Sequence, residues 1–307
     1  MVMLEKITNQ NAIDLSELGL IRASGQDVTL FLQGQLTCDL EEINAEQSRL
    51  GAHCDAKGRI IAIFRLFFYQ NNYYFLLPRN TLPLLLSSLQ KYALFSKNVV
   101  LVDVSQDFQK IGIYGPTLKS LFEAQKLSFK ENEVLELNHV LSVSIPGPVP
   151  RVVLLAPLHF IHVRFEQQNV HHWHLLDILA GIPTIYPETS GQFTPHQLNL
   201  PELGAVCFHK GCYIGQEIIA RTHYLGKSKS RLYRVRFNAQ NSFLPGTLLF
   251  DSAEKIEQGA LMMSAEEDKN LYQALISLQT KAISHTIRLG CPEGPKLEFL
   301  ELPYSTN

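Results

Sequence analysis

The stretch "HKGCYIGQEIIAR", residues 209–221, combines a nucleophile with the backbone freedom to present it. Cys212 lies between Gly211 and Gly215, and Lys210 comes two residues before it. The tail of the stretch has helical spacing, so Cys212 should lie just before a helix N-terminus, where backbone dipoles and a nearby ammonium favour the thiolate. Glycine also lets a backbone approach a ligand closely. The alternative is a glycine-rich turn that packs a small buried cysteine.

The other cysteines do not extend this pattern into a metal or disulfide framework. The odd, scattered set contains no CxxC pair and comprises Cys38, Cys54, Cys207, Cys212 and Cys291. Such a set argues against disulfides and against a ribbon-type zinc site. Cys207, His209 and Cys212 imitate a metal cluster, but the glycines indicate another use of the loop, so we expect no metal.

The single tryptophan, Trp173, lies in "VHHWHLLDILAGIP" among three histidines. Adjacent positions on one element point in different directions, so these histidines do not predict a metal site. Trp173 is either a core anchor or a face on which a flat heteroaromatic ligand stacks.

The elements around these residues predict a mixed α+β fold. Residues 19–36 read as a strand, a turn at Ser24-Gly25 and a helix, and "HCDAKGRI" reads as a glycine-bearing turn. Two apolar runs flank Asn71-Asn72 and predict a β-hairpin. A helical segment and a strand follow, and a second β-β-α-β unit extends through "RVVLLAP". We expect two intertwined subdomains in residues 1–225, with the chain switching near residues 50 and 105.

From Leu232 onward, short strands separated by turn residues predict a small β-barrel or sandwich, which we assign to residues 226–307. The basic run "YLGKSKSRLYR", residues 224–234, lies at the junction. It is either a solvated linker or a site for a polyanionic partner.

Composition sets the cellular context. The formal charge of -2 and the pI of about 6.6 provide no global positive field for a nucleic-acid backbone, so we expect no direct nucleic-acid partner. The first residues lack a signal-peptide pattern, and no run of 18 apolar residues occurs. We therefore expect a cytoplasmic protein without a membrane partner.

Four stretches resemble one family. "KGCYIGQE" is similar to the signature of the YgfZ family, folate-binding proteins related to the T-protein (aminomethyltransferase) of the glycine cleavage system. The others are "FLQGQLTCDL", "HCDAKGR" and "SGQFTPHQLNLPELGAV", and the terminal "LPYS" fits as well.

The resemblance implies a T-protein-like three-domain ring around a tetrahydrofolate channel, with the C-terminal barrel as the third domain. It also implies a role in making or repairing iron-sulfur clusters in selected client enzymes, including those that thiomethylate tRNA. Residues that fall on the signature are Lys210, Gly211, Cys212, Tyr213, Gly215, Gln216 and Glu217. Of these, Cys212 and Lys210 would act chemically. Trp173 and Asp55 would contact the folate.

Two departures from the T-protein pattern bear on catalysis. Ala62 and Ile63 stand where T-proteins carry two aspartates, one of them catalytic, and Leu179 replaces a glutamate that contacts the pterin. Folate recognition should then be weaker or differently arranged, since a charge-assisted partner is lost.

These features favour a folate-dependent accessory factor that acts through the 210–217 loop without conventional turnover. One alternative is a folate-dependent aminomethyltransferase or demethylase that uses another carboxylate, such as Asp55, as acid or base. A second alternative is an RNA-binding module that uses residues 224–234.

Overall fold

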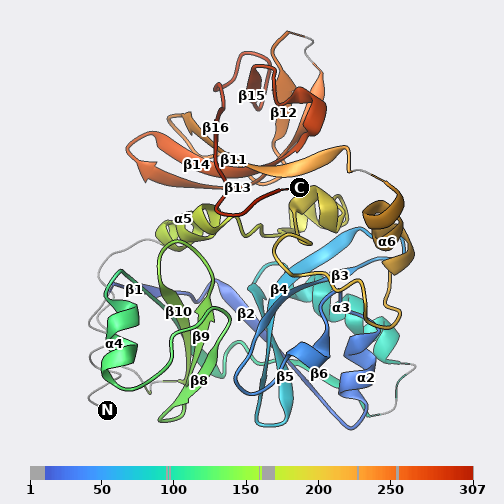
Figure 1. Ribbon diagram of the computed structural model, residues 1–307, viewed down its shortest axis with the longest axis vertical. Helices are drawn as coiled ribbons and strands as arrows, with labels where there is room; N and C mark the ends of the chain where they lie inside the picture. Colours follow the sequence, from blue (N-terminus) through green and yellow to red (C-terminus); the bar gives the residue numbers. More distant parts are fainter. Residues whose placement is uncertain are drawn as a thin grey trace. The chain divides into compact units, whose positions relative to one another are not determined.

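The computed structural model describes residues 11–94, 96, 98–158, 160, 170–226, 228–253 and 256–306. The chain divides into two compact units, each assembled from separated segments. The first unit contains residues 1–33, 39–50 and 64–173, and the second contains 34–38, 51–63 and 174–307. Helices are interspersed among runs of strands that pair antiparallel, which agrees with the α+β prediction (Figure 1).

One five-stranded antiparallel sheet lies wholly in the first unit. Its strands, in spatial order, are β1 (Asn11–Asp14), β7 (Phe108–Tyr114), β10 (Arg151–Pro157), β9 (Val140–Ile145) and β8 (Val134–Leu137). Helix α4 (Leu118–Ala124) buries Leu118 and Phe122, which are one turn apart, in the same core as Ile111 and Val152. The apolar face of this sheet is therefore closed by its own crossover helix.

A second five-stranded sheet contains the elements predicted around the "HCDAKGRI" turn. Its strands, in spatial order, are β3 (Arg49–Cys54), β4 (Ile60–Tyr69), β5 (Asn72–Pro78), β2 (Leu18–Ser24) and β6 (Val100–Asp103). Helices α2 (Val28–Gln33) and α3 (Leu82–Ala93) follow β2 and β5. Strands β3 and β4 each cross from one unit to the other, so the 55–59 turn between them belongs to the second unit.

The β4–β5 hairpin is present, but its turn is one residue earlier than predicted. Tyr69 pairs with Asn72, and the turn residues Gln70 and Asn71 have φ values of 47° and 59°. Two left-handed residues in a two-residue loop match the right-handed twist of the flanking strands. The four-residue strands β1 and β8 were not predicted from the sequence.

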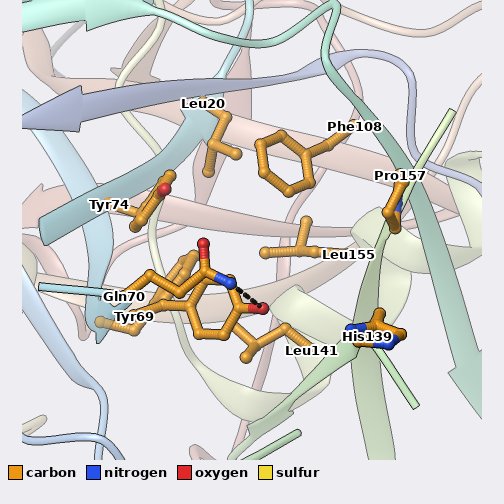
Figure 2. Close-up of a pocket in the computed structure, with 10 residues that line it drawn as sticks. Leu20, Tyr69, Gln70, Tyr74, Phe108, His139, Leu141, Leu155 and Pro157 are labelled. Carbon is orange, nitrogen blue, oxygen red and sulfur yellow. Dashed lines mark hydrogen bonds between the residues drawn. The ribbon is translucent and has the colours of Figure 1, made fainter. Parts of the chain in front are cut away.

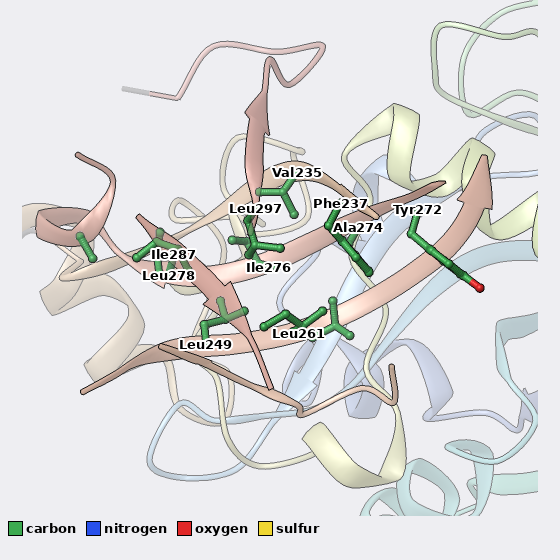
Figure 3. Packing of buried hydrophobic residues seen from close by; sticks show 12 residues of the cluster. Val235, Phe237, Leu249, Leu261, Tyr272, Ala274, Ile276, Leu278, Ile287 and Leu297 are labelled. Atoms are coloured by element: carbon green, nitrogen blue, oxygen red, sulfur yellow. The ribbon is translucent and has the colours of Figure 1, made fainter. Parts of the chain in front are cut away.

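The C-terminal sheet contains all six strands predicted there. In spatial order they are β15 (Ile287–Leu289), β12 (Leu248–Asp251), β13 (Glu257–Asp268), β14 (Leu271–Gln279), β11 (Ser230–Asn238) and β16 (Glu298–Leu300). Register shifts interrupt β13 twice where it pairs with β14, and such bulges bend a sheet. The sheet curls into a half-barrel around an apolar cluster that includes Leu249, Leu261 and Ile276 (Figure 3).

Other helical elements of the second unit precede this sheet in the chain: η2 (Pro187–Thr189), η3 (Pro195–Leu198) and α6 (Gln216–Leu225). The short η4 (Thr280–Ala282) lies between β14 and β15. The first unit contains η1 (Leu40–Glu42). Helix α5 (His171–Ala180) begins in the first unit and ends in the second. In the described part of the chain, no helix has the length and apolarity needed to cross a membrane.

The end of the chain is attached to the residue that follows α5. The Tyr304 hydroxyl donates to the Gly181 carbonyl at 2.9 Å. Gly181 has a φ of 65°, and a Cβ there would lie 2.6 Å from the Tyr304 ring. The "LPYS" motif therefore has a packing role against a position that only glycine fills well.

Candidate functional site

Residues 210–217, here called the cysteine loop, end at the N-terminus of α6 as predicted. Gly215 is the residue before the helix and has a φ of 79°. A Cβ at this position would lie 2.6 Å from the Asp55 carbonyl oxygen and 2.9 Å from the Gly58 Cα. Gly215 therefore allows the loop to pack backbone to backbone against the 55–59 turn. Gly211 differs, since a Cβ there would meet no atom within 4 Å.

The 55–59 turn is itself held by the Asp55 side chain. Asp55 Oδ1 accepts from the backbone N–H groups of Lys57 and Arg59, both at 2.8 Å. The Asp55 N–H donates to the Arg59 carbonyl at 2.8 Å. One carboxylate oxygen thus shapes the surface against which Gly215 packs.

Lys210 connects the cysteine loop to residues 34–38. Its ammonium donates to the carbonyls of Leu36 at 2.9 Å and Cys38 at 2.7 Å. It also lies 5.3 Å from the centroid of the Tyr213 ring, and the residue is only 9% exposed. A buried ammonium with these partners holds two segments of chain together, which is a positioning role that sequence reasoning did not assign to it.

Thr37 strengthens the same connection from the other side. Its hydroxyl donates to the Ala205 carbonyl at 2.7 Å and accepts from the Ala52 N–H at 2.9 Å. Its carbonyl accepts from the Cys207 N–H at 2.8 Å. Residues 34–38 are therefore bonded to β3 and to the approach of the cysteine loop. The "FLQGQLTCDL" resemblance pointed to this segment, but nothing in its residue types predicted the contacts.

Within the loop, two hydrogen bonds join Tyr213 and Gln216. The Gln216 N–H donates to the Tyr213 carbonyl at 3.1 Å, and the Tyr213 N–H donates to Gln216 Oε1 at 3.3 Å. The Tyr213 ring is 6% exposed, and burial raises the pKa of its phenol. Among the described residues, its buried hydroxyl finds no hydrogen-bond partner. The neutral phenol is thus a donor available to a bound polar group.

Cys212 is exposed, so the alternative of a buried packing cysteine is wrong at this position. Cys38 and Cys54 are buried, and burial raises the pKa of the Cys54 thiol. Cys291 is also exposed but lies in the C-terminal sheet region. Cys212 is accordingly an accessible thiol on a loop whose two ends are fixed by Lys210 and Gly215. That it acts chemically, with Lys210 favouring its thiolate, stays a prediction.

Trp173 lies at the start of α5 in the first unit and is 4% exposed. The Arg151 guanidinium lies 5.2 Å from the centroid of its ring. A Cβ at Gly112 would lie 2.6 Å from the indole, so the absence of a side chain there makes room for it. These contacts give Trp173 a packing role, and its stacking on a ligand stays a prediction.

Ala62 and Ile63 are buried in β4, with exposures of 0% and 5%. Both belong to the second unit, as do Asp55 and the whole cysteine loop. An apolar pair in a strand core supplies no proton donor or acceptor. The structure therefore brings Asp55 and the cysteine loop together, while these two positions contribute packing.

Several relatives among curated proteins share one name. The chain is 33% identical over 240 residues to the "tRNA-modifying protein YgfZ" of Colwellia psychrerythraea, with 75% of this chain and 73% of the relative covered. It is 32% identical over 308 residues to the protein of that name from Photorhabdus laumondii, covering 96% and 92%. The chain belongs to the YgfZ family. A comparison with models of protein families finds no match.

The YgfZ chain also resembles a solved T-protein structure. The crystal structure of the glycine cleavage system aminomethyltransferase T from Bartonella henselae superposes with a TM-score of 0.72 over 98% of this chain and 88% of that one. The sequence identity is 13%, so the likeness concerns the fold. The predicted T-protein-like fold and the predicted family are both confirmed.

Proposed function

We propose that this chain is a folate-dependent accessory factor for the synthesis or repair of iron-sulfur clusters in selected enzymes, including those that thiomethylate tRNA. The relatives' shared name, "tRNA-modifying protein", supports the link to tRNA. The observation that carries the proposal is an exposed Cys212 on a loop fixed by buried contacts at both ends. A fixed and accessible thiol suits transient chemistry with a small molecule or a client protein.

The groups around the cysteine loop fit a folate. The pterin ring carries N–H and carbonyl groups. Several buried polar atoms of the second unit find no partner among the described residues, and two of them, Tyr213 Oη and Gln35 Oε1, belong to the cysteine loop and to the 34–38 segment bonded to it. A ring that donates to one and accepts from the other offsets their desolvation. Tetrahydrofolate, when bound, supplies a carrier for one-carbon units. Asp55 acts by shaping the turn behind Gly215.

Complementation of a deletion strain tests the proposal, with tRNA thiomethylation and the activity of iron-sulfur enzymes as readouts. Cys212→Ala should abolish complementation, and Lys210→Ala should reduce it because residues 34–38 lose their ammonium partner. Cys291→Ala is the matched control, since Cys291 is equally a free, exposed thiol. Full complementation by Cys212→Ala would overturn the proposal, as would equal losses for Cys212 and Cys291.

Binding of tetrahydrofolate is tested through the emission of Trp173. A ligand that stacks on the indole gains roughly 0.5–1.5 kcal/mol beyond its buried area, so Trp173→Phe should weaken binding by less than Trp173→Ala does. Calorimetry measures the affinities, and titration of the wild type follows the emission. Binding seen by calorimetry with unchanged emission would refute the stacking assignment.

The aminomethyltransferase alternative is separated by one substitution. Asp55→Asn keeps an oxygen that accepts from the Lys57 and Arg59 N–H groups but removes the acid-base function. Under our proposal this variant complements and the wild type transfers no methylene group from aminomethyl donors at a catalytic rate. Rapid transfer that Asp55→Asn abolishes would instead establish the enzyme.

A further inference from the structure

A pocket of about 290 Å³ opens in the first unit, and no residue of the proposed site lines it (Figure 2). Its buried wall is formed by Leu20, Phe67, Leu141 and Leu155. This volume lies at the lower end of the range of roughly 300–1,000 Å³ typical of ligand pockets. The pocket suits a molecule of one or two rings.

Two hairpin turns supply the rim. The β4–β5 turn places Gln70 there, and the β8–β9 turn places His139 (Figure 2). Asn138 and His139 have φ values of 50° and 66°, which repeats the left-handed pair of the first turn. The two hairpins are joined where the Tyr69 hydroxyl donates to Glu136 Oε1 at 3.1 Å. The opening is therefore framed by tight turns that are tied to each other.

Aromatic rings surround the space in several orientations. Phe67 and Tyr74 stack with centroids 5.4 Å apart, and Phe108 meets Tyr74 edge-on at 6.2 Å. Tyr69 is tilted by 51° to Tyr74. Rings in perpendicular and parallel settings give a planar guest both stacked and edge-to-face contacts.

Tyr69 offers a hydrogen-bond acceptor at the rim. The Tyr69 oxygen accepts from Gln70 Nε2 at 2.9 Å and uses its own proton toward Glu136. A hydroxyl oxygen has a second lone pair, and the Gln70 amide has its own oxygen. Burial and the Glu136 carboxylate raise the pKa of Tyr69, so the phenol stays neutral. The Tyr74 hydroxyl is bonded to Arg22. A guest that bonds to the remaining lone pair of the Tyr69 oxygen must donate a hydrogen bond.

We propose that this pocket binds a small planar aromatic molecule that carries an N–H donor on its ring. The rings and leucines enclose the planar body, and the Tyr69 oxygen accepts from the N–H at the rim. The Glu136 carboxylate beside Tyr69 disfavours an anionic guest. This inference is independent of the cysteine loop and stands or falls separately from the proposed function.

Indole and benzofuran are matched probes, because they have the same shape and only indole has the N–H. Protein labelled with ¹³C in its leucine methyl groups is titrated with each. Indole should shift the methyl signals of Leu141 and Leu155 in the full-length wild type, and benzofuran should bind about three- to tenfold more weakly. Absence of shifts at these methyls up to the solubility of indole would overturn the proposal.

Two further arms make the test specific. Tyr69→Phe removes the acceptor and also the bond to Glu136. Loss of that bond should weaken both probes by the same factor, so the ratio of the indole affinity to the benzofuran affinity should fall to about one. Equal affinities of the two probes for the wild type would contradict the donor requirement. Saturating tetrahydrofolate should leave indole bound, and its displacement would show that the pocket is part of a folate site, which contradicts the inference.

Discussion

At the scale of single residues, the two glycines of the cysteine loop have different tasks. Gly215 has a left-handed backbone and a neighbour that a Cβ would touch, whereas Gly211 is exposed beside open space. Sequence reasoning treated both as means of close approach to a ligand. The structure shows that the close approach at Gly215 is to the 55–59 turn of the chain itself. Gly211 alone keeps an open side for a partner or ligand.

Replacing each glycine by alanine should distinguish these two roles. Gly215→Ala should lower the free energy of unfolding by about 1–3 kcal/mol, since it combines a left-handed non-glycine residue with a clash at the Asp55 carbonyl. Gly211→Ala should change it by no more than about 0.5 kcal/mol. Urea unfolding measures both. Equal effects of the two substitutions would contradict this assignment.

His196 gives the second unit a dependence on pH. Both of its ring nitrogens are buried without a hydrogen-bond partner among the described residues. Burial is the main cause that lowers the pKa of His196 to about 4, and electrostatic repulsion from His223 and Arg231 lowers it further. The folded-state pKa lies below the unfolded value of about 6.5, so below pH 6.5 the unfolded chain binds a proton at this site more readily than the folded chain does. The free energy of unfolding is therefore highest above pH 6.5 and decreases as the pH falls toward 4.

Replacing His196 by leucine should therefore flatten the pH profile. Between pH 7 and pH 5, His196→Leu should lose less unfolding free energy than the wild type does, because no proton binds the unfolded state at this site. Ile283→Ala is the control, since it changes an exposed side chain without a titratable group and should keep the wild-type profile. An unaltered profile in His196→Leu would show that the histidine does not contribute.

At the scale of elements, β14 is an interior strand of the C-terminal half-barrel. It pairs with β13 on one side and β11 on the other, and Ile276 faces both Leu261 and Tyr233 in register. Ile276 is completely buried in the cluster drawn in Figure 3. Removing its side chain leaves a cavity. Because β14 is hydrogen-bonded along both edges, it cannot shift easily to fill that cavity.

Ile276→Ala should lower the free energy of unfolding by about 2–5 kcal/mol. Ile283→Ala is the matched control, because Ile283 is 45% exposed and should cost about 0.5 kcal/mol or less. Thermal and urea unfolding of both variants measure the difference. A small effect at Ile276 would mean that the half-barrel relaxes around the missing side chain.

Elements with several repeats of their pattern were predictable from the sequence. Helices α3 and α6 and the longer C-terminal strands β11, β13 and β14 have this property, and β1 and β8 do not. The three-residue strands β15 and β16 were predicted from the turn residues around them. The cysteine loop and its neighbouring helix were also predicted. The partners of Lys210 were not, because they are backbone carbonyls more than 170 residues away and carry no sequence signal. Packing between distant segments decides such contacts.

At the scale of the whole molecule, the charge bears on how the chain relates to tRNA. A protein with a net charge of -2 has no overall positive field to attract the phosphates of an RNA. The basic run at 224–234 is divided between the end of α6 and the start of β11, and Lys227 lies outside the described residues. We expect no salt-dependent binding of tRNA to the purified protein in gel-shift or fluorescence titrations. Affinity that falls steeply between low and physiological salt would favour the RNA-binding alternative.

The bonds from Lys210 to Leu36 and Cys38 also set an order of events during biosynthesis. The partners are separated by 174 and 172 residues, so the carbonyls emerge from the ribosome long before the ammonium that binds them. At roughly 5–20 residues per second, that delay is on the order of ten to thirty seconds. A nascent chain that stops before residue 210 holds residues 34–38 without this partner. Premature termination in that interval should yield chains that depend on chaperones or are degraded, however completely the N-terminal sheets have formed.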